Sequence, residues 1–152
     1  MEALSLRRIG TVFAPETEER DQDWGPVESR IELLSEFQGG LGGLAEFSHV
    51  SVVTFLHQAR WDPAHDLIRR PRGLARMPEL GIFAQRAKDR PNPIGITAVA
   101  LLEVGAGHLR VRGLDAVDGT PVLDLKPYFP HYDRVDSPVV PSWVEELMRG
   151  YF

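Results

Sequence analysis

The spacing of hydrophobic residues predicts short β-strands along most of the chain. Residues 50–56 are rich in β-branched side chains and predict a buried strand, whereas residues 6–13 alternate more weakly. Residues 29–34 are compatible with a strand or a helix, and the alternation of Ile31 and Leu33 with polar residues favours the strand. Further strands are expected at residues 81–85, 94–104, 108–114 and 122–125, the second and third joined as a hairpin across residues 105–107.

Helical signals are confined to two places. Residues 141–151 predict a C-terminal helix, in which Ser142 serves as the N-cap and Glu145 completes a capping box. A short helical piece is expected near Ala45, after a glycine-rich turn that begins at Gln38. The proline-containing residues 14–27 and 60–78 predict long loops.

This pattern predicts a mostly-β fold: a small antiparallel β-barrel with long loops and a short C-terminal helix. Strands do not alternate with long helices, so a parallel sheet covered by helices is not expected. A closed barrel also leaves no sheet edge exposed to other chains. With 152 residues, 43% of them hydrophobic and 26% charged, the chain is expected to form one domain over residues 1–152.

Composition excludes several kinds of site. Without cysteine, the chain cannot form a disulfide framework, a thiolate zinc site or a cysteine nucleophile. No set of His, Asp and Glu has the spacing of metal ligands, so no metal is expected. The N-terminal residues contain no apolar signal region, and no apolar run approaches the roughly 18 residues of a membrane span. We therefore expect a cytoplasmic protein that does not bind a membrane.

The charge distribution leaves nucleic-acid binding open. A net charge of −5 argues against indiscriminate binding to nucleic acid, which depends on neutralising phosphates. A basic stretch between residues 69 and 90 is either a solvated loop or a docking surface. Its basic members are Arg69, Arg70, Arg72, Arg76, Arg86, Lys88 and Arg90.

Two polar turns carry the strongest signs of a ligand site. The sequence Arg-Pro-Asn-Pro-Ile-Gly at residues 90–95 suits neither a helix nor a central strand. A rigid loop that carries an arginine is typical of a binding surface. The sequence Asp-Gly-Thr-Pro at residues 118–121 has the same polar character, and it is equally a good turn sequence.

Side chains near these turns offer candidate chemistry. Arg86 carries a fork of donors suited to a carboxylate or a phosphate. His57 and Gln58 end the predicted buried strand and either support the structure or bind the polar edge of a ligand. Three carboxylates that lie close together in sequence either attract a cationic ligand or pair with their neighbours. They are Asp115, Asp118 and Asp124.

Six stretches of the chain, taken in order, resemble one protein family. They are Leu-Ala-Glu-Phe-Ser-His-Val at 44–50, Phe-Leu-His-Gln at 55–58, Gly-Ile-Phe-Ala-Gln-Arg at 81–86, Arg-Pro-Asn-Pro-Ile-Gly at 90–95, Gly-Leu-Asp-Ala-Val-Asp-Gly-Thr-Pro-Val at 113–122 and Asp-Leu-Lys-Pro-Tyr at 124–128. Over residues 6–133 the chain is similar to the TsaA-like (YaeB/TrmO) family of S-adenosylmethionine-dependent tRNA methyltransferases.

The resemblance implies a small β-barrel enzyme that works as a homodimer and takes a methyl group from S-adenosyl-L-methionine. The implied reaction is methylation of N6 of threonylcarbamoyl-adenosine at position 37 of a tRNA. Asp118 and Asp124 are then candidates to accept the proton that leaves N6, to attract the sulfonium or to hold a ribose. The implied cofactor-binding residues are Trp24, Gly25, Pro26, His57, Gln58, Arg86, Ile96, Asp118, Gly119, Thr120 and Pro121.

Two departures from the family pattern keep other functions open. Residues 87–89 read Ala-Lys-Asp, where relatives often carry small hydroxyl residues and an aromatic residue, so contacts with the acceptor can differ. The additional C-terminal domain of longer bacterial members has no counterpart in these residues; if that domain helps to hold tRNA, this protein is expected to do without it, to use another substrate or to bind more weakly. The alternatives are a methyltransferase of the same fold acting on a small molecule or another nucleic acid, and a non-catalytic S-adenosylmethionine-binding module.

Overall fold

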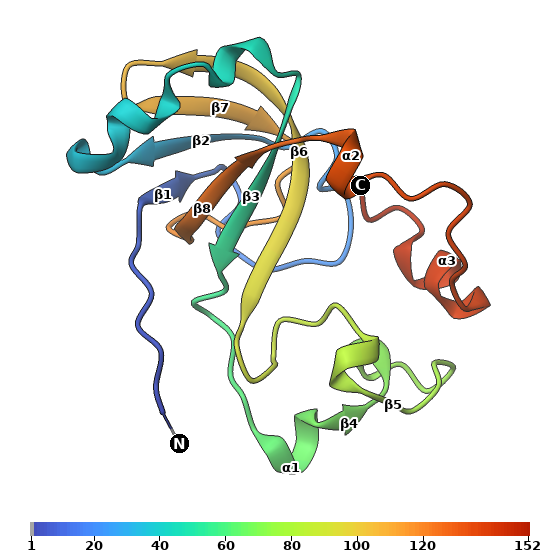
Figure 1. Ribbon diagram of the computed structural model, residues 1–152. Coiled ribbons are helices and arrows are strands. Elements are labelled where there is room, and N and C mark those ends of the chain that lie inside the picture. The colour runs from blue at the N-terminus through green and yellow to red at the C-terminus, as the bar shows by residue number, and fades with distance from the viewer. Residues whose placement is uncertain (1) are drawn as a thin grey trace.

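Six antiparallel strands close into a barrel in the computed structural model, which describes residues 2–152 (Figure 1). The strands are β1 (Gly10–Phe13), β2 (Glu28–Leu33), β3 (His49–Phe55), β6 (Ile94–Gly105), β7 (His108–Arg112) and β8 (Pro121–Pro127). They neighbour one another in the order β1, β2, β7, β6, β3, β8, and β8 pairs with β1 to close the ring. The predicted small antiparallel barrel is confirmed.

Alternating side chains fill the interior of the barrel. In β2, Ser29, Ile31 and Leu33 are buried and the charged residues between them are exposed, as the two-residue period of a strand requires. The buried core consists of Val12, Ile31, Leu33, Leu41, Val50, Val52, Val99, Leu109, Val111, Leu114, Ala116 and Val122. Because side chains fill the interior of a small barrel, a ligand site is expected at its ends or among its loops.

The longest connection is the excursion, residues 56–93, which joins β3 to β6. It contains α1 (Pro63–Asp66), a two-stranded sheet of β4 (Ile68–Arg69) and β5 (Leu80–Gly81), and the 3-10 turns η3 (Pro71–Gly73) and η4 (Ile82–Ala84). Figure 1 shows the excursion in green beyond the end of the barrel that β3 leaves and β6 enters. It therefore stands apart from the barrel core.

The predicted helices are present, although one predicted cap is wrong. The helical piece expected near Ala45 is η2 (Leu44–Glu46), which follows η1 (Ser35–Leu41). The C-terminal helix is α3 (Ser142–Met148), and a further short helix is α2 (Pro130–Asp133). Ser142 is the first helical residue rather than the N-cap, because Pro141 takes the cap position and no side chain caps the helix. Within residues 2–152, no helix combines the length and apolar character needed to cross a bilayer.

The structure of the excursion differs from two predictions. The strand predicted for residues 81–85 is wrong beyond Gly81, because the chain turns into η4. Gln85 enforces this turn: its Nε2 donates to the carbonyls of Arg69 at 2.7 Å and Leu80 at 3.0 Å. The loop predicted for residues 60–78 in fact contains α1, β4 and η3. The Asp62 carboxylate caps α1 by accepting a hydrogen bond from the backbone N–H of Ala64.

Candidate functional site

A cavity of about 1100 Å³ lies between the end of the barrel, the excursion and the C-terminal segment, residues 142–152. Thr97 of β6 and Asp115 of the loop after β7 line it from the barrel, Arg86 from the excursion and Tyr151 from the C-terminal segment. Its volume slightly exceeds the roughly 300–1,000 Å³ that is usual for small-molecule sites. It can therefore hold a small ligand together with part of a second one.

Part of the predicted cofactor-binding set lines this cavity. The lining residues of that set are Trp24, His57, Gln58, Arg86, Ile96 and Thr120. The remaining residues of the set lie outside the lining, and they are Gly25, Pro26, Asp118, Gly119 and Pro121. His57 and Gln58 are exposed at the cavity, so a ligand can reach their polar atoms. The binding role of each residue stays a prediction.

The Asp-Gly-Thr-Pro turn uses its polar groups to fix the start of β8. Asp118 Oδ1 accepts the Ala14 N–H at 3.0 Å, and the Thr120 hydroxyl donates to the Val117 carbonyl at 2.6 Å. Gly119 has a φ of 85°, in the left-handed region that favours glycine. The contacts of Asp118 are therefore those of a turn residue beside the cavity lining.

Asp124 lies at a different place from Asp118. It lines a second cavity of about 580 Å³, which β8 shares with η1 and η2. Its Oδ2 lies 2.9 Å from Lys126 Nζ, and its Oδ1 accepts the Leu125 N–H at 2.9 Å. The two carboxylates predicted as proton acceptors are thus not brought together at the larger cavity.

Asp115 is the carboxylate of the sequence cluster that lines the larger cavity. The Thr97 hydroxyl donates to its Oδ1 at 2.6 Å, and the Tyr151 hydroxyl donates to its Oδ2 at 2.6 Å. Burial raises the pKa of Tyr151, and so do the charge of Asp115 and the hydrogen bond to it, so the phenol stays a donor. Within residues 2–152, Asp115 forms no ion pair, and its charge is held by hydroxyl groups.

Other carboxylates that line the cavity are partnered by cations. Lys88 Nζ lies 2.9 Å from Asp89 Oδ1 and 3.8 Å from Glu19 Oε2, and Arg72 Nε lies 3.4 Å from Asp21 Oδ1. Burial works against the charged form of Asp89, but hydrogen bonds from a backbone N–H and from Lys88 outweigh burial and lower its pKa. These carboxylates therefore have cationic partners, whereas the contacts of Asp115 are with hydroxyl groups.

The C-terminal segment is pinned against the loop between β1 and β2. Trp24 N–H donates to the Tyr151 carbonyl at 2.8 Å, and Tyr151 packs against Trp24, Val27 and Val117. Phe152 lies directly over Gly25. This wall could not be predicted from local sequence patterns, because its contacts join residues that lie far apart in the chain.

Gly25→Ala is expected to displace the last residues from this loop. A Cβ at position 25 would lie 2.5 Å from the carbonyl carbon of Phe152, which is closer than real side chains approach. We expect hydrogen-exchange protection of the Trp24 amide to fall roughly two- to tenfold, as for the loss of about one hydrogen bond. Gly39→Ala is the matched control, since nothing lies within 4 Å of its added Cβ. Unchanged protection in Gly25→Ala would contradict the observed contact.

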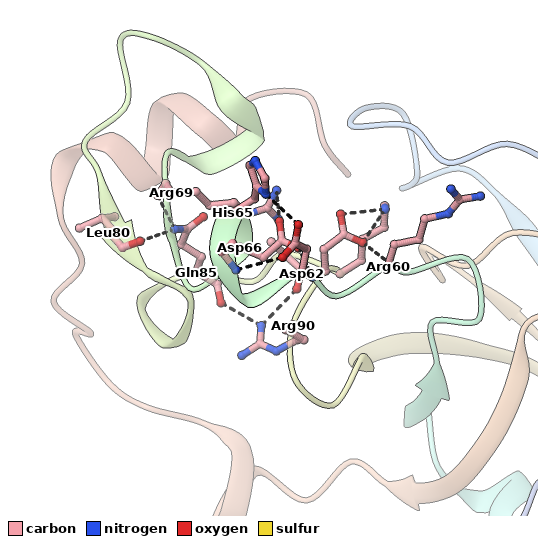
Figure 2. A network of polar contacts seen from close by, with 12 residues as sticks. Arg60, Asp62, His65, Asp66, Arg69, Leu80, Gln85 and Arg90 are labelled. Atoms are coloured by element: carbon pink, nitrogen blue, oxygen red, sulfur yellow. Dashed lines mark hydrogen bonds and ion pairs between the residues drawn. The ribbon is translucent and has the colours of Figure 1, made fainter.

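Arg86 and Arg90 of the excursion line the cavity and have no carboxylate partner within residues 2–152. Arg86 Nη2 donates to the Ile96 carbonyl at 2.7 Å, which holds the guanidinium at the wall of the cavity. Arg90 Nη1 donates to the carbonyls of Gln85 at 3.0 Å and Ala87 at 3.3 Å. Figure 2 shows Arg90 reaching back to the backbone of the excursion. Arg90 therefore braces the Pro-Asn-Pro loop, and both charges are available to an anionic group.

Buried polar atoms in the lining also lack a partner. Gln85 Oε1, Arg69 Nε and Arg20 Nε make no hydrogen bond within the described part of the chain. All three residues line the cavity. A buried polar atom without a partner is unfavourable, so the lining is suited to a ligand that carries both donors and acceptors.

Comparison with known proteins finds one family and several relatives. Residues 16–134 match the family of tRNA-methyltransferase O N-terminal domains. A probable S-adenosyl-L-methionine-binding protein of Methanothermobacter thermautotrophicus is 39% identical, over 88% of this chain and 94% of its own length. A probable S-adenosyl-L-methionine-binding protein of Pyrococcus abyssi is 37% identical, over 94% of this chain and 77% of its own length. The tRNA (adenine(37)-N6)-methyltransferase of Escherichia coli is 36% identical, over 86% of this chain and 60% of its own length.

Solved structures share the fold at similar identity. The crystal structure of TrmO from Pseudomonas aeruginosa superposes with a TM-score of 0.76 at 33% identity, over 94% of this chain and 62% of that chain. A second crystal structure of TrmO superposes with a TM-score of 0.73 at 35% identity, over 91% of this chain and 61% of that chain. This chain thus spans less than two-thirds of the solved TrmO chains.

Proposed function

Because the chain belongs to the family of tRNA-methyltransferase O N-terminal domains, we propose that it is an S-adenosylmethionine-dependent methyltransferase. The proposed acceptor is N6 of threonylcarbamoyl-adenosine at position 37 of a tRNA. The name of the E. coli relative, a tRNA (adenine(37)-N6)-methyltransferase, supports this acceptor. The observation that carries the proposal is the convergence of three family-motif residues on one cavity; they are His57, Gln58 and Arg86.

The donors and acceptors of the cavity suit the proposed cofactor. S-adenosylmethionine supplies a methyl group already activated on a sulfonium, so the protein mainly has to position it. Arg86 offers a fork of donors to the carboxylate of such a ligand. Gln85 Oε1 is buried, accepts no hydrogen bond from the described residues, and can accept one from an amino group. Ile96, which is 53% exposed in the lining, supplies apolar contact.

Asp115 is our proposed acceptor of the N6 proton. An amine that gains a methyl group must lose a proton, and a carboxylate within reach can take it. The other carboxylates of the lining are paired with Lys88 or Arg72, whereas the partners of Asp115 within residues 2–152 are hydroxyl groups. Thr97 and Tyr151 act as positioning residues, because each hydrogen bond fixes one oxygen of the carboxylate. Asp118 and Asp124, predicted for this role from sequence, fit it less well, because neither lines the cavity.

The basic stretch of the excursion is the proposed docking surface for tRNA. Arg69, Arg70 and Arg72 all lie in it, and Arg69 and Arg72 are paired with Asp66 at 3.8 Å and with Asp21 at 3.4 Å. We expect tRNA affinity to fall as salt rises, with a logarithmic slope of about 0.7–0.9 for each phosphate contacted. Replacing the three arginines by alanine should weaken binding and reduce the slope in filter-binding titrations. A slope that is unchanged in the triple variant would contradict this surface.

The cellular test is mass spectrometry of tRNA nucleosides from a strain that lacks the gene. The expected result is loss of N6-methylated threonylcarbamoyl-adenosine, restored by the wild-type gene. Unchanged tRNA together with S-adenosylmethionine binding would favour a small-molecule methyltransferase or a non-catalytic binding module. The archaeal relatives, named only as S-adenosyl-L-methionine-binding proteins, motivate this second candidate. The proposal also includes a homodimer located in the cytoplasm. Light scattering tests the oligomeric state, and cell fractionation tests the location.

A further inference from the structure

Phe83 is an exposed aromatic residue at the cavity that neither folding nor the proposed cofactor site requires. Its side chain is 80% exposed, yet the residue lines the cavity beside Arg86. Its neighbour Ile82 is 1% exposed and supplies the packing of η4. The phenyl group of Phe83 therefore contributes little to the core and is presented to whatever approaches the cavity.

Several hydrogen bonds hold the turn that carries Phe83 in place. Ile82 N–H donates to the Leu67 carbonyl at 2.9 Å, and Gln85, only 6% exposed, donates to carbonyls of β4 and β5. Arg90 donates to the Gln85 carbonyl at 3.0 Å. Figure 2 shows Gln85 between the backbone of β4 and β5, with Arg90 on its other side. A rigid turn presents an aromatic ring at little cost in conformational entropy.

The charges around Phe83 indicate the kind of partner. Arg86 and Arg90 carry guanidinium groups without a carboxylate partner within residues 2–152. An exposed aromatic ring and an arginine without a carboxylate partner in one cavity lining form the combination that binds unpaired nucleobases: the ring stacks on a base while the cation attracts a phosphate. A purely apolar partner would leave the charge of Arg90 uncompensated, since Arg86 is assigned to the carboxylate of the methyl donor.

We propose that Phe83 is a stacking surface for an unpaired base in the loop of the RNA acceptor. The stacked base is held at the mouth of the cavity, next to the proposed methyl-donor site. This inference rests on the proposed function and deepens it, because it selects single-stranded loops over duplex RNA.

The test uses an RNA anticodon stem-loop that carries 2-aminopurine at one loop position at a time. With the wild-type protein, at least one labelled position should lose fluorescence on binding, as a base does when it stacks. Phe83→Ala should abolish that change and weaken binding by roughly 10- to 100-fold. Phe83→Trp should retain both, whereas Phe83→Leu, which is apolar but not aromatic, should not. Tyr132→Ala is the matched control, since Tyr132 is 83% exposed and does not line the cavity.

Three results would overturn the inference, and they are distinguishable. If the wild type binds and methylates RNA and Phe83→Ala equals it, the stacking surface is wrong and the proposed function stands. If the wild type neither binds nor methylates RNA, the proposed function fails and the inference fails with it. If Phe83→Ala converts a dimer into a monomer in sedimentation, the ring contacts a second copy instead. Calorimetric affinity for S-adenosylmethionine should be unchanged in every Phe83 variant.

Discussion

Asp115→Asn is expected to lower the rate of methyl transfer by roughly 10²-fold or more. The amide has nearly the same shape as the carboxylate, and its oxygen can keep one of the two hydrogen bonds from Thr97 and Tyr151, but its NH2 group can only donate to the other hydroxyl and the amide cannot accept a proton as a base. Single-turnover kinetics with saturating donor and tRNA measure this step. Affinity for S-adenosylmethionine, measured by calorimetry, should change little, because the charge acts on the acceptor.

Asp118→Asn is the matched control for this variant. Asp118 binds the Ala14 N–H and does not line the cavity, so its replacement should leave turnover close to that of the wild type. The reverse pattern, with turnover retained in Asp115→Asn and lost in Asp118→Asn, would return the assignment to the residue that the sequence motif favoured. A loss of donor affinity in Asp115→Asn, with turnover retained, would mean that Asp115 attracts the sulfonium instead.

Arg86→Ala is expected to weaken binding of S-adenosylmethionine by roughly 10- to 100-fold, as for the loss of a charge-assisted hydrogen bond. The Ile96 carbonyl orients its guanidinium at the cavity wall, and no carboxylate within residues 2–152 competes for it. Arg86→Lys keeps the charge but loses the fork of donors, so it should recover only part of the affinity. Isothermal titration calorimetry measures all three proteins.

Arg60→Ala is the control for Arg86. Arg60 is exposed on the same excursion, and it neither lines the cavity nor forms an ion pair within the described residues. Its replacement removes one positive charge without touching the proposed donor site. Equal losses of donor affinity in both variants would mean that Arg86 acts through general charge, and an unchanged affinity in Arg86→Ala would exclude it from the site.

The barrel could be predicted from sequence because its strands are half-buried and their pattern is local. Ile31 and Leu33 alternate with charged residues, and β2 begins and ends within one residue of the predicted segment. The strand predicted at residues 81–85 failed for a non-local reason. Gln85 bonds to carbonyls at positions 69 and 80, and these contacts turn the chain where the hydrophobic pattern alone predicts extension.

The sequence motifs predicted several residues that line the candidate site, but they did not show which carboxylate lines it. Motif residues such as His57 and Arg86 do line one cavity. Sequence spacing could not separate Asp115 from Asp118, because the partners that distinguish Asp115 are Thr97 and Tyr151, 18 and 36 residues away. The wall formed by the C-terminal segment was equally hidden, since its contacts depend on tertiary packing.

The proposed activity is tested most directly by measuring methyl transfer by the purified protein. The protein is incubated with S-adenosylmethionine labelled in its methyl group and with tRNA that carries threonylcarbamoyl-adenosine, and the nucleosides are then analysed by mass spectrometry. The expected product carries one labelled methyl group on N6 of threonylcarbamoyl-adenosine, and its rate of formation should fall roughly 10²-fold or more in Asp115→Asn. Binding of S-adenosylmethionine without any transfer of label to tRNA would contradict the proposed activity.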